Sequence, residues 1–248
     1  VEGLKNWAKQ SKNNFNKKFY KFMLWLNPII GFSIVFLIGF GILNPSAFVV
    51  FLILPFSLVG FKLGIINKEH ALMSKKTDLL IKYSKLFKLV EEENFESLLI
   101  QKIKNNICIG GHSAFAEIKN LSKIMSAFDY RLNMIMGFTL NIFFLWDIRQ
   151  LIKLEKWKLK NSDQLNSWFD NLSTIDELNS FAGFNFSSQL STLPTFSKEF
   201  SIDAKNAMHP FIKKDNNVGN AITVSGWKQF KVITGANMAG KSTYLRTV

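Results

Sequence analysis

Cysteine and arginine are both scarce in this 248-residue chain, and no secretory signal opens it. The one cysteine, Cys108, excludes an internal disulfide framework and is typical of proteins in a reducing compartment. The basic stretch from Lys5 to Lys21 is long, and no small-residue cleavage site follows the apolar residues after it. The composition therefore argues against a secreted, disulfide-stabilised domain.

Acidic residues are few relative to basic ones: 18 Asp and Glu stand against 31 Lys and Arg, which gives a net charge of +13. Such an excess favours a polyanionic partner, namely nucleic acid, nucleotide phosphates or an anionic membrane face. Almost all of it is lysine, because arginine occurs only at Arg131, Arg149 and Arg246. A coding bias toward lysine and asparagine would give the same excess, so both interpretations stay open.

Long apolar runs are the most prominent feature that is present. Phe22–Leu43 and Ser46–Ile66 are 22 and 21 residues long and are separated by Asn44 and Pro45. At about 1.5 Å per helical residue, each run reaches roughly 30 Å, the thickness of a bilayer's hydrocarbon core. The only charge in either run is Lys62, near the end of the second. We predict a two-helix transmembrane hairpin over residues 22–66; the alternative is a buried hairpin inside a soluble core.

The distribution of lysines predicts the orientation of this hairpin. Lysines flank both of its outer ends and are missing from the turn between the runs (Lys17, Lys18 and Lys21 before; Lys62, Lys68, Lys75 and Lys76 after). Cytoplasmic flanks of membrane helices carry such an excess of positive charge. We therefore expect a location at the cytoplasmic membrane, with the rest of the chain on the cytoplasmic side.

Residues 67–198 carry helical patterns. One amphipathic stripe repeats at three- and four-residue spacing and predicts a helix (Leu79, Leu80, Tyr83, Leu86, Leu89 and Val90). The apolar run Met134–Trp146 is only 13 residues long and contains Asn141, so we predict a buried core helix rather than a span. Thr174, with Glu177 three residues later, predicts a capping box that opens a further helix. His112, a lone histidine, is not expected to be catalytic.

From residue 199 the pattern changes to β. The stretches "EFSIDAKNAMHPFI" and "NAITVSGWKQFKVIT" alternate apolar and polar residues among glycines and asparagines. The predicted fold is thus mostly α, with a membrane hairpin and a helical core, followed by the opening strands of an α/β domain. We predict four segments: 1–21 basic, 22–66 transmembrane, 67–198 helical, and 199–248 the N-terminal part of the α/β domain.

A phosphate-binding motif lies at Gly235–Ser242, where the pattern G-x-x-x-x-G-K-[ST] occurs. Gly235 and Gly240 allow backbone N–H groups to turn toward phosphate oxygens. Lys241 would place a cation on the β- and γ-phosphates, and the Ser242 hydroxyl would contact Mg²⁺. The apolar run Phe230–Ile233 predicts the preceding strand, and residues 242–248 are compatible with the following helix. The expected cofactors are therefore ATP and Mg²⁺.

The stretch "TGANMAGKSTYLR", Thr234–Arg246, resembles the MutS family of DNA mismatch-repair ATPases, whose loop typically reads TGPNMAGKSTYLR. Ala236 stands where the family usually has proline. The segment "MHPFI" resembles the family's R-H-P segment, with His209 and Pro210 retained and Met208 in place of arginine. The resemblance is strong over about residues 205–248, moderate over about 128–195 and absent over the first 70.

The resemblance implies that residues 67–198 form the family's helical core and lever, and that residues 199–248 start an α/β P-loop ATPase domain of the ABC type. It also implies a nucleotide site and partners. It implies that Val218 and Asn220, in "NNVGNAITV", lie on the adenine side. It also implies double-stranded DNA as a partner and a homodimer in the full-length protein. Its nucleotide-binding loop would comprise Gly235, Ala236, Asn237, Met238, Ala239, Gly240, Lys241, Ser242 and Thr243.

Several functions remain open from the sequence. The first is an ATP-binding, membrane-anchored DNA-binding protein of the MutS type. The second is a membrane-bound P-loop ATPase of MutS descent with a non-repair role, since the family's mismatch-reading Phe-x-Glu motif is not found and "NFES" at Phe95 lacks its setting. The third is a non-catalytic interaction module. The chain begins at Val1 and stops five residues after Thr243, so we interpret it as a fragment and expect poor or no ATP hydrolysis by it alone.

Overall fold

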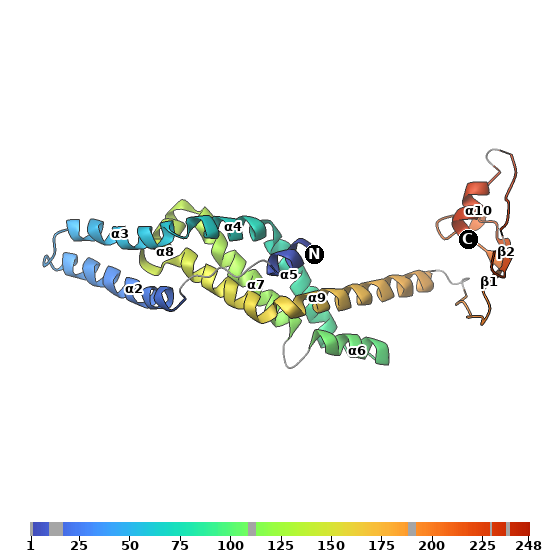
Figure 1. Ribbon diagram of the computed structural model, residues 1–248, viewed down its shortest axis with the longest axis horizontal. Helices are drawn as coiled ribbons and strands as arrows, with labels where there is room; N and C mark the ends of the chain where they lie inside the picture. Colours follow the sequence, from blue (N-terminus) through green and yellow to red (C-terminus); the bar gives the residue numbers. More distant parts are fainter. Residues whose placement is uncertain (1, 10–16, 109–112, 188–191, 229, 237–238) are drawn as a thin grey trace. The chain divides into compact units, whose positions relative to one another are not determined.

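The computed structural model describes residues 2–9, 17–108, 113–187, 192–228, 230–236 and 239–248. The chain forms two units, Val1–Ser187 and Ser188–Val248. The first unit is helical, and the second holds a small sheet and one helix (Figure 1). The predicted mostly α fold is therefore confirmed.

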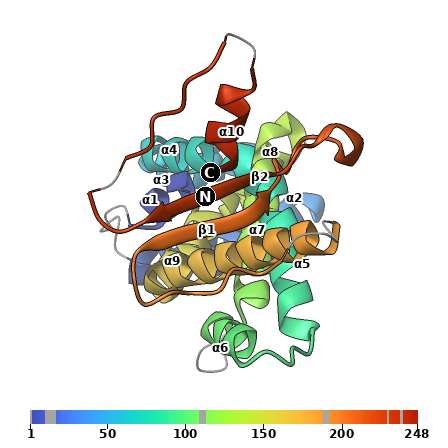
Figure 2. The ribbon, with the colours of Figure 1, turned by 90° about the vertical axis from the view of Figure 1, so that its right-hand side faces the viewer.

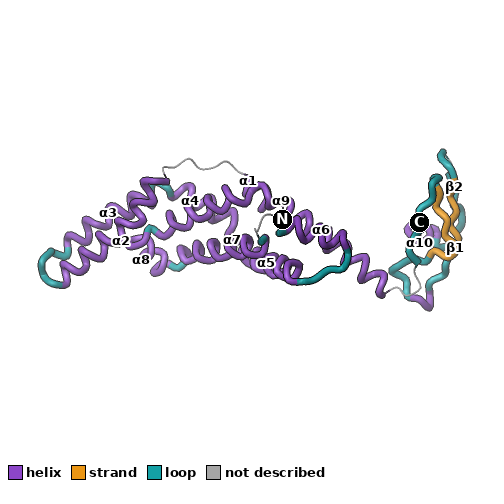
Figure 3. Tube along the Cα trace, turned by 90° about the horizontal axis from the view of Figure 1, so that it is seen from below, coloured by secondary structure: helices purple, strands orange, loops and turns teal. Residues whose placement is uncertain are grey.

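The first unit consists of α-helices joined by loops and turns (Figure 3), with a short 3-10 turn between α4 and α5 and another between α7 and α8. Its described elements are α1 (Glu2–Lys9), α2 (Lys17–Gly39), α3 (Ser46–Gly60), α4 (Leu63–Met73), η1 (Ser74–Lys76), α5 (Thr77–Glu92), α6 (Leu98–Ile107), α7 (Ala114–Phe128), η3 (Asp129–Leu132), α8 (Met134–Phe144) and α9 (Trp146–Ser187).

Helices α2 and α3 form the predicted hairpin, and most of their outward-facing apolar side chains are exposed. Trp25, for example, is 79% exposed. The turn between the helices uses Gly41 at φ 72°, and the Asn44 side chain accepts a hydrogen bond from the Ser46 N–H at 3.0 Å. This surface has the apolar character of a lipid-facing helix pair.

The second helix of the hairpin is shorter than predicted. The run Ser46–Ile66 breaks after Gly60, and α4 starts at Leu63, so α3 has only 15 residues. By length and apolar composition, one described helix could cross a membrane, Lys18–Gly39. The number rises to three if α3 with the helices after it, bent by 56°, and α8 with α9, bent by 80°, each count as one span. The second run is therefore divided between α3 and α4, and the two-helix transmembrane hairpin over residues 22–66 stays a prediction.

The core of this unit lies where α5 and α7 pack against α9. Along α9, buried residues recur every three or four positions, as expected for one helix face, and most of those on this face are apolar. The helix predicted from the apolar stripe is confirmed as α5; Leu80 and Val90 of the stripe are buried, as is Phe87 outside it, whereas Leu79, Leu86 and Leu89 are exposed. The largest apolar side chains of this core include Phe87, Phe128, Ile118, Leu121, Met125, Leu151, Leu154, Leu165 and Trp168.

A buried charged cluster fixes α1 to this core. Lys158 Nζ lies 3.0 and 2.8 Å from the two carboxylate oxygens of Glu69, and the Trp7 indole N–H donates to the same carboxylate at 2.8 Å. The Trp7 ring also stacks on Trp157, with 6.2 Å between ring centroids. The ion pair is thus surrounded by aromatic rings and satisfied by three hydrogen bonds.

Two predictions for the helical region are wrong. No helix opens at Thr174, because α9 runs without a break for 42 residues, and the Thr174 hydroxyl donates to the Asp170 carbonyl one turn earlier. Nothing between Lys160 and Thr174 interrupts a helix, so the serine, threonine and asparagine side chains bond within it. The run Met134–Trp146 is no buried core helix either, because α8 packs on α2 and α3 and exposes most of its first turn.

The second unit contains a two-stranded antiparallel sheet, with β1 (Ser201–Ala207) beside β2 (Asn220–Ser225). The 3-10 turn η4 (Lys214–Asn216) lies in the connection, and α10 (Lys241–Thr247) lies next to β2 (Figure 2). The register pairs Ile202 with Val224 and is irregular between Ala204 and Ala207.

The predicted strand Phe230–Ile233 is not formed, although the segment is described. Phe230 and Val232 are both largely exposed. A strand of a parallel sheet needs a neighbour on which its N–H and C=O groups can pair, and the described sheet consists of β1 and β2 alone. The start of an ABC-type domain therefore remains a prediction.

Candidate nucleotide-binding site

The residues before α10 form a turn whose conformation requires glycine. Gly240 has φ 81° and precedes Lys241, the first residue of the helix. This left-handed region is open to glycine and costly for residues with a Cβ. The prediction that a helix begins near Lys241 is confirmed.

The lysine of the motif folds back over the turn. The Lys241 ammonium donates to the carbonyl of Gly235, six residues earlier. A Cβ placed on Gly235 would lie 3.7 Å from Lys241 Cδ, so the lysine stem runs along the inner side of the turn. The structure thus brings the first glycine and the lysine together; Asn237 and Met238 lie outside the described residues.

A cavity of about 480 Å³ lies beside this turn. Its lining includes both predicted adenine-side residues, Val218 and Asn220, together with Gly240, Lys241 and Thr243. Its size falls within the roughly 300–1,000 Å³ of small-molecule sites. The other lining residues are His209, Ile212, Asn216, Asn217, Ile233, Thr234, Ala239, Tyr244 and Thr247.

Three predicted loop residues do not line this cavity. Gly235, Ala236 and Ser242 are absent from its lining, and all three are exposed. The Ser242 hydroxyl, the predicted Mg²⁺ contact, is in the first turn of α10. Among the residues that the structure describes, no three His, Cys, Asp or Glu side chains gather into a metal-binding group.

The adenine-side residues are carried by a tightly held connection between the strands. Asn217 donates to the His209 carbonyl at 2.8 Å and accepts from the His209 N–H at 3.3 Å. A Cβ on Gly219 would lie 1.6 Å from Asn206 Oδ1, so no side chain fits at residue 219 without movement of Asn206. Asn220 then donates to the Val218 carbonyl at 3.1 Å. These contacts place Val218 and Asn220 on one short turn.

Sequence reasoning missed two side chains of α10. The Tyr244 hydroxyl donates to the Ala221 carbonyl at 3.2 Å and so joins the helix to β2. Tyr244 and Thr247, three residues apart, share one helix face and line the cavity. Their spacing from Lys241 would have indicated this face once the start of the helix was known.

The arrangement fits a nucleotide's phosphates in three respects. The turn holds a glycine with positive φ at the start of a helix, it holds an ammonium group along its inner side, and it borders a cavity of suitable size. Backbone N–H groups in such a turn and a lysine beside them are the groups that bind phosphate oxygens in P-loops.

Comparison with known proteins gives partial matches to mismatch-repair proteins. A DNA mismatch repair protein MutS of Ehrlichia ruminantium is 28% identical over 160 residues, which cover 64% of this chain and 18% of that protein. A MutS of Clostridium novyi is 36% identical over 41% of this chain and 11% of its own length. A DNA mismatch repair protein MSH3 of Lodderomyces elongisporus is 42% identical over 32% of this chain and 8% of its own length.

These matches support a relationship to the MutS family. The chain spans less than a fifth of the length of these relatives. No protein-family model matches the chain, and no solved structure matches it significantly.

Proposed function

We propose that this MutS-related chain binds ATP with Mg²⁺ at the turn of residues 235–243 and belongs to a membrane-anchored, DNA-binding ATPase. The observation that carries the proposal is the cavity that joins Val218 and Asn220 to Gly240 and Lys241. The resemblance to the MutS loop assigned these residues to the phosphates and to adenine, and the cavity brings the two groups to one place.

Different residues contact different parts of the nucleotide. Val218 and Asn220 lie on the adenine side, while the backbone of Gly235–Gly240 and the Lys241 ammonium bind the phosphates. The Ser242 hydroxyl contacts Mg²⁺. Bound ATP supplies the free energy of phosphoanhydride hydrolysis to the whole protein. Tyr244 holds this site against β2 through its bond to the Ala221 carbonyl.

Double-stranded DNA is the proposed macromolecular partner, in a homodimer of the full-length protein. The relatives are named as DNA mismatch repair proteins, and the net charge of +13 favours a polyanion. Binding to DNA phosphates releases counterions, so affinity should fall steeply as salt concentration rises.

Helices α2 and α3 are the proposed membrane anchor, with the second unit on the cytoplasmic side. Their exposed apolar surface and the lysines at both outer ends support this orientation. The same hairpin favours a second function, a membrane-bound P-loop ATPase of MutS descent with a non-repair role. The two functions differ in one measurable property, the recognition of mismatched duplex.

Nucleotide binding is tested on the whole chain in detergent or nanodiscs with a fluorescent ATP analogue and Mg²⁺. Lys241→Ala should weaken binding about 10- to 100-fold, since hydrogen bonds to charged groups contribute about 1.5–3 kcal/mol. The matched control is Lys231→Ala, which removes an exposed lysine of the same unit outside the motif. Equal affinity of the Lys241→Ala variant and the parent chain would refute the proposed phosphate site.

The DNA proposal is tested separately by titrating matched and mismatched duplexes at several salt concentrations. Preference for the mismatch supports repair, and salt-dependent binding without preference supports the non-repair function. ATP binding without any affinity for duplex would refute DNA as the partner.

A further inference from the structure

An apolar surface outside the hairpin has no covering within the described structure. It lies at the start of α8, where Met134 is 88% and Ile135 is 78% exposed, and it continues to Met136 and Phe138. None of the 11 residues of α8 is charged. Transfer of each such side chain from water to an apolar environment is favourable by roughly 1.5–3 kcal/mol of free energy. This surface is therefore more stable in contact with apolar groups than with water.

This surface is continuous with that of the hairpin. The half-exposed Phe138 contacts the half-exposed Phe56 of α3, with 5.3 Å between ring centroids. Phe143 stacks on Phe32 of α2 at 4.9 Å. A Cβ on Gly31 would lie 3.0 Å from the Phe143 ring, so the glycine permits this close approach. Whatever surrounds α2 and α3 therefore also reaches α8.

The C-terminal end of α8 has its carbonyls bonded by a residue of the hairpin. Asn27, fully buried in α2, donates to the carbonyls of Ile142 and Phe143 at 2.8 and 2.9 Å. Asn141 accepts from the Asp147 N–H at 3.0 Å and donates to the Gly137 carbonyl at 2.9 Å. Lipid offers no hydrogen bonds, so helix ends can enter it only when the protein itself bonds them.

The N-terminal end of α8 is bonded in the same way. The Asn133 side chain accepts from the Met136 N–H at 3.1 Å. Both ends of α8 are therefore capped by asparagine side chains, which suits a helix in an environment without water.

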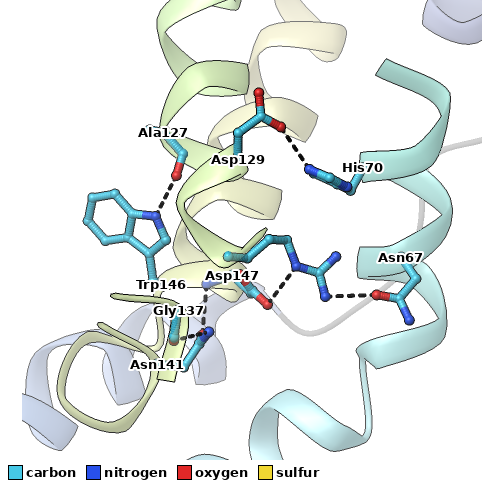
Figure 4. A network of polar contacts seen from close by, with 9 residues as sticks. Asn67, His70, Ala127, Asp129, Gly137, Asn141, Trp146 and Asp147 are labelled. Atoms are coloured by element: carbon cyan, nitrogen blue, oxygen red, sulfur yellow. Dashed lines mark hydrogen bonds and ion pairs between the residues drawn. The ribbon is translucent and has the colours of Figure 1, made fainter. Parts of the chain in front are cut away.

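The charges that flank α8 are paired with one another (Figure 4). Arg131 and Asp147 lie 3.3 Å apart, and Arg131 also donates to Asn67 of α4 at 2.7 Å. Next to them, His70 and Asp129 are 2.8 Å apart. The Trp146 indole donates to the Ala127 carbonyl. Paired charges beside an aromatic residue with a bonded polar tip are typical of the edge of an apolar layer.

We propose that α8 is embedded in the bilayer beside α2 and α3, as a short element that enters and leaves on the same side. Its 11 residues reach about 16 Å, half of a hydrocarbon core of about 30 Å. Leu145, with φ 47°, then turns the chain, and α9 leaves at 80° to α8. The inference rests on the proposed membrane anchor and extends it to a third element.

The test uses the whole chain with Cys108→Ser, so that one new cysteine at a time carries an environment-sensitive fluorophore. The new sites are Ile135→Cys in α8, Phe36→Cys in α2 as the lipid reference, and Lys156→Cys on the exposed face of α9 as the water reference. Each variant is reconstituted into vesicles of neutral and anionic phospholipids. Quenchers attached near the headgroup or deep in the acyl chains then report the depth of each site.

The emission maximum of the label at Ile135 should shift to shorter wavelength when the chain is reconstituted into vesicles. Its fluorescence should be quenched strongly by the quencher near the headgroup and less by the quencher deep in the acyl chains. A label at Ile135 that behaves as at Lys156, while the label at Phe36 is quenched, overturns the embedding of α8 but leaves the anchor intact. Absence of quenching at both Ile135 and Phe36 overturns the anchor itself. Equal deep quenching at Ile135 and Phe36 overturns the shallow, one-sided placement. Far-ultraviolet circular dichroism checks that each variant keeps the helical content of the parent.

Discussion

Substitutions in the buried ion pair between Lys158 and Glu69 should be among those that most reduce the stability of the helical unit. Its side chains are only 10% and 5% exposed. Lys158→Met removes the cation and two of the three hydrogen bonds to the carboxylate, and the Trp7 indole remains as the sole donor. Removing one partner of such a pair costs about 3–5 kcal/mol, because the other charge is left buried.

The matched control lies two residues along α9. Lys160 pairs with Glu117 at 2.5 Å, but its side chain is 48% exposed. Its partner Glu117 is 14% exposed but also accepts a hydrogen bond from Asn161 at 3.0 Å, so Lys160→Met should cost less than Lys158→Met, nearer the roughly 0–1 kcal/mol of exposed pairs. The free energy of unfolding is measured in micelles by denaturant titration, with near-ultraviolet circular dichroism as the signal.

A double variant separates the charge effect from loss of packing. Lys158→Met with Glu69→Leu removes both charges and leaves only the Trp7 N–H without its acceptor, which costs about 1–3 kcal/mol. The double variant should therefore be more stable than the sum of the two single changes predicts. Strictly additive losses, or a Lys158→Met chain as stable as the Lys160→Met chain, would refute this account of the cluster.

Three further predictions concern other parts of the chain. Gly31→Ala should lower stability by about 1–3 kcal/mol, since its Cβ would lie 2.9 Å from an aromatic ring, whereas Gly39→Ala in the same helix meets nothing within 4 Å; denaturation midpoints of the two variants test this. Burial, with a smaller contribution from a nearby glutamate, raises the pKa of the Cys108 thiol, so less thiolate exists at pH 8 than in the unfolded chain. Alkylation of the native chain should therefore be slower than that of the denatured chain and should keep accelerating above pH 9, which a rate–pH profile measures; identical profiles would contradict it. Gly219→Ala should weaken binding of the ATP analogue by displacing the adenine-side turn, and adding Asn206→Ala should restore it; an unrescued loss would point to backbone strain instead.

Much of the helical unit could be predicted because its signals are local. The apolar run Phe22–Leu43 and the three- and four-residue spacing on α5 both follow from helix geometry. Which side of α5 is buried depends on α7 and α9, which are distant in sequence, so the spacing could not tell that Leu86 and Leu89 are exposed. The same limit applies to Met134–Trp146, whose short length indicated a core helix, whereas its packing partner is the hairpin.

The sequence predicted individual residues of the candidate site, but not the tertiary contacts that bring them together. The spacing of Gly235, Gly240 and Lys241 indicated the turn, and the positive φ of Gly240 agrees with it. The resemblance alone placed Val218 and Asn220 near adenine. The connection from β2 to α10 through Tyr244 depends on tertiary contact and left no pattern in the sequence.

The length of α9 has a mechanical consequence. Its 42 residues form a rod of about 63 Å. In Figures 1 and 3 the tips of α2 and α3 lie at one end of the first unit and the C-terminal end of α9 at the other. If the proposed anchor lies in a bilayer, this rod would hold its own C-terminal end at a distance from the lipid headgroups.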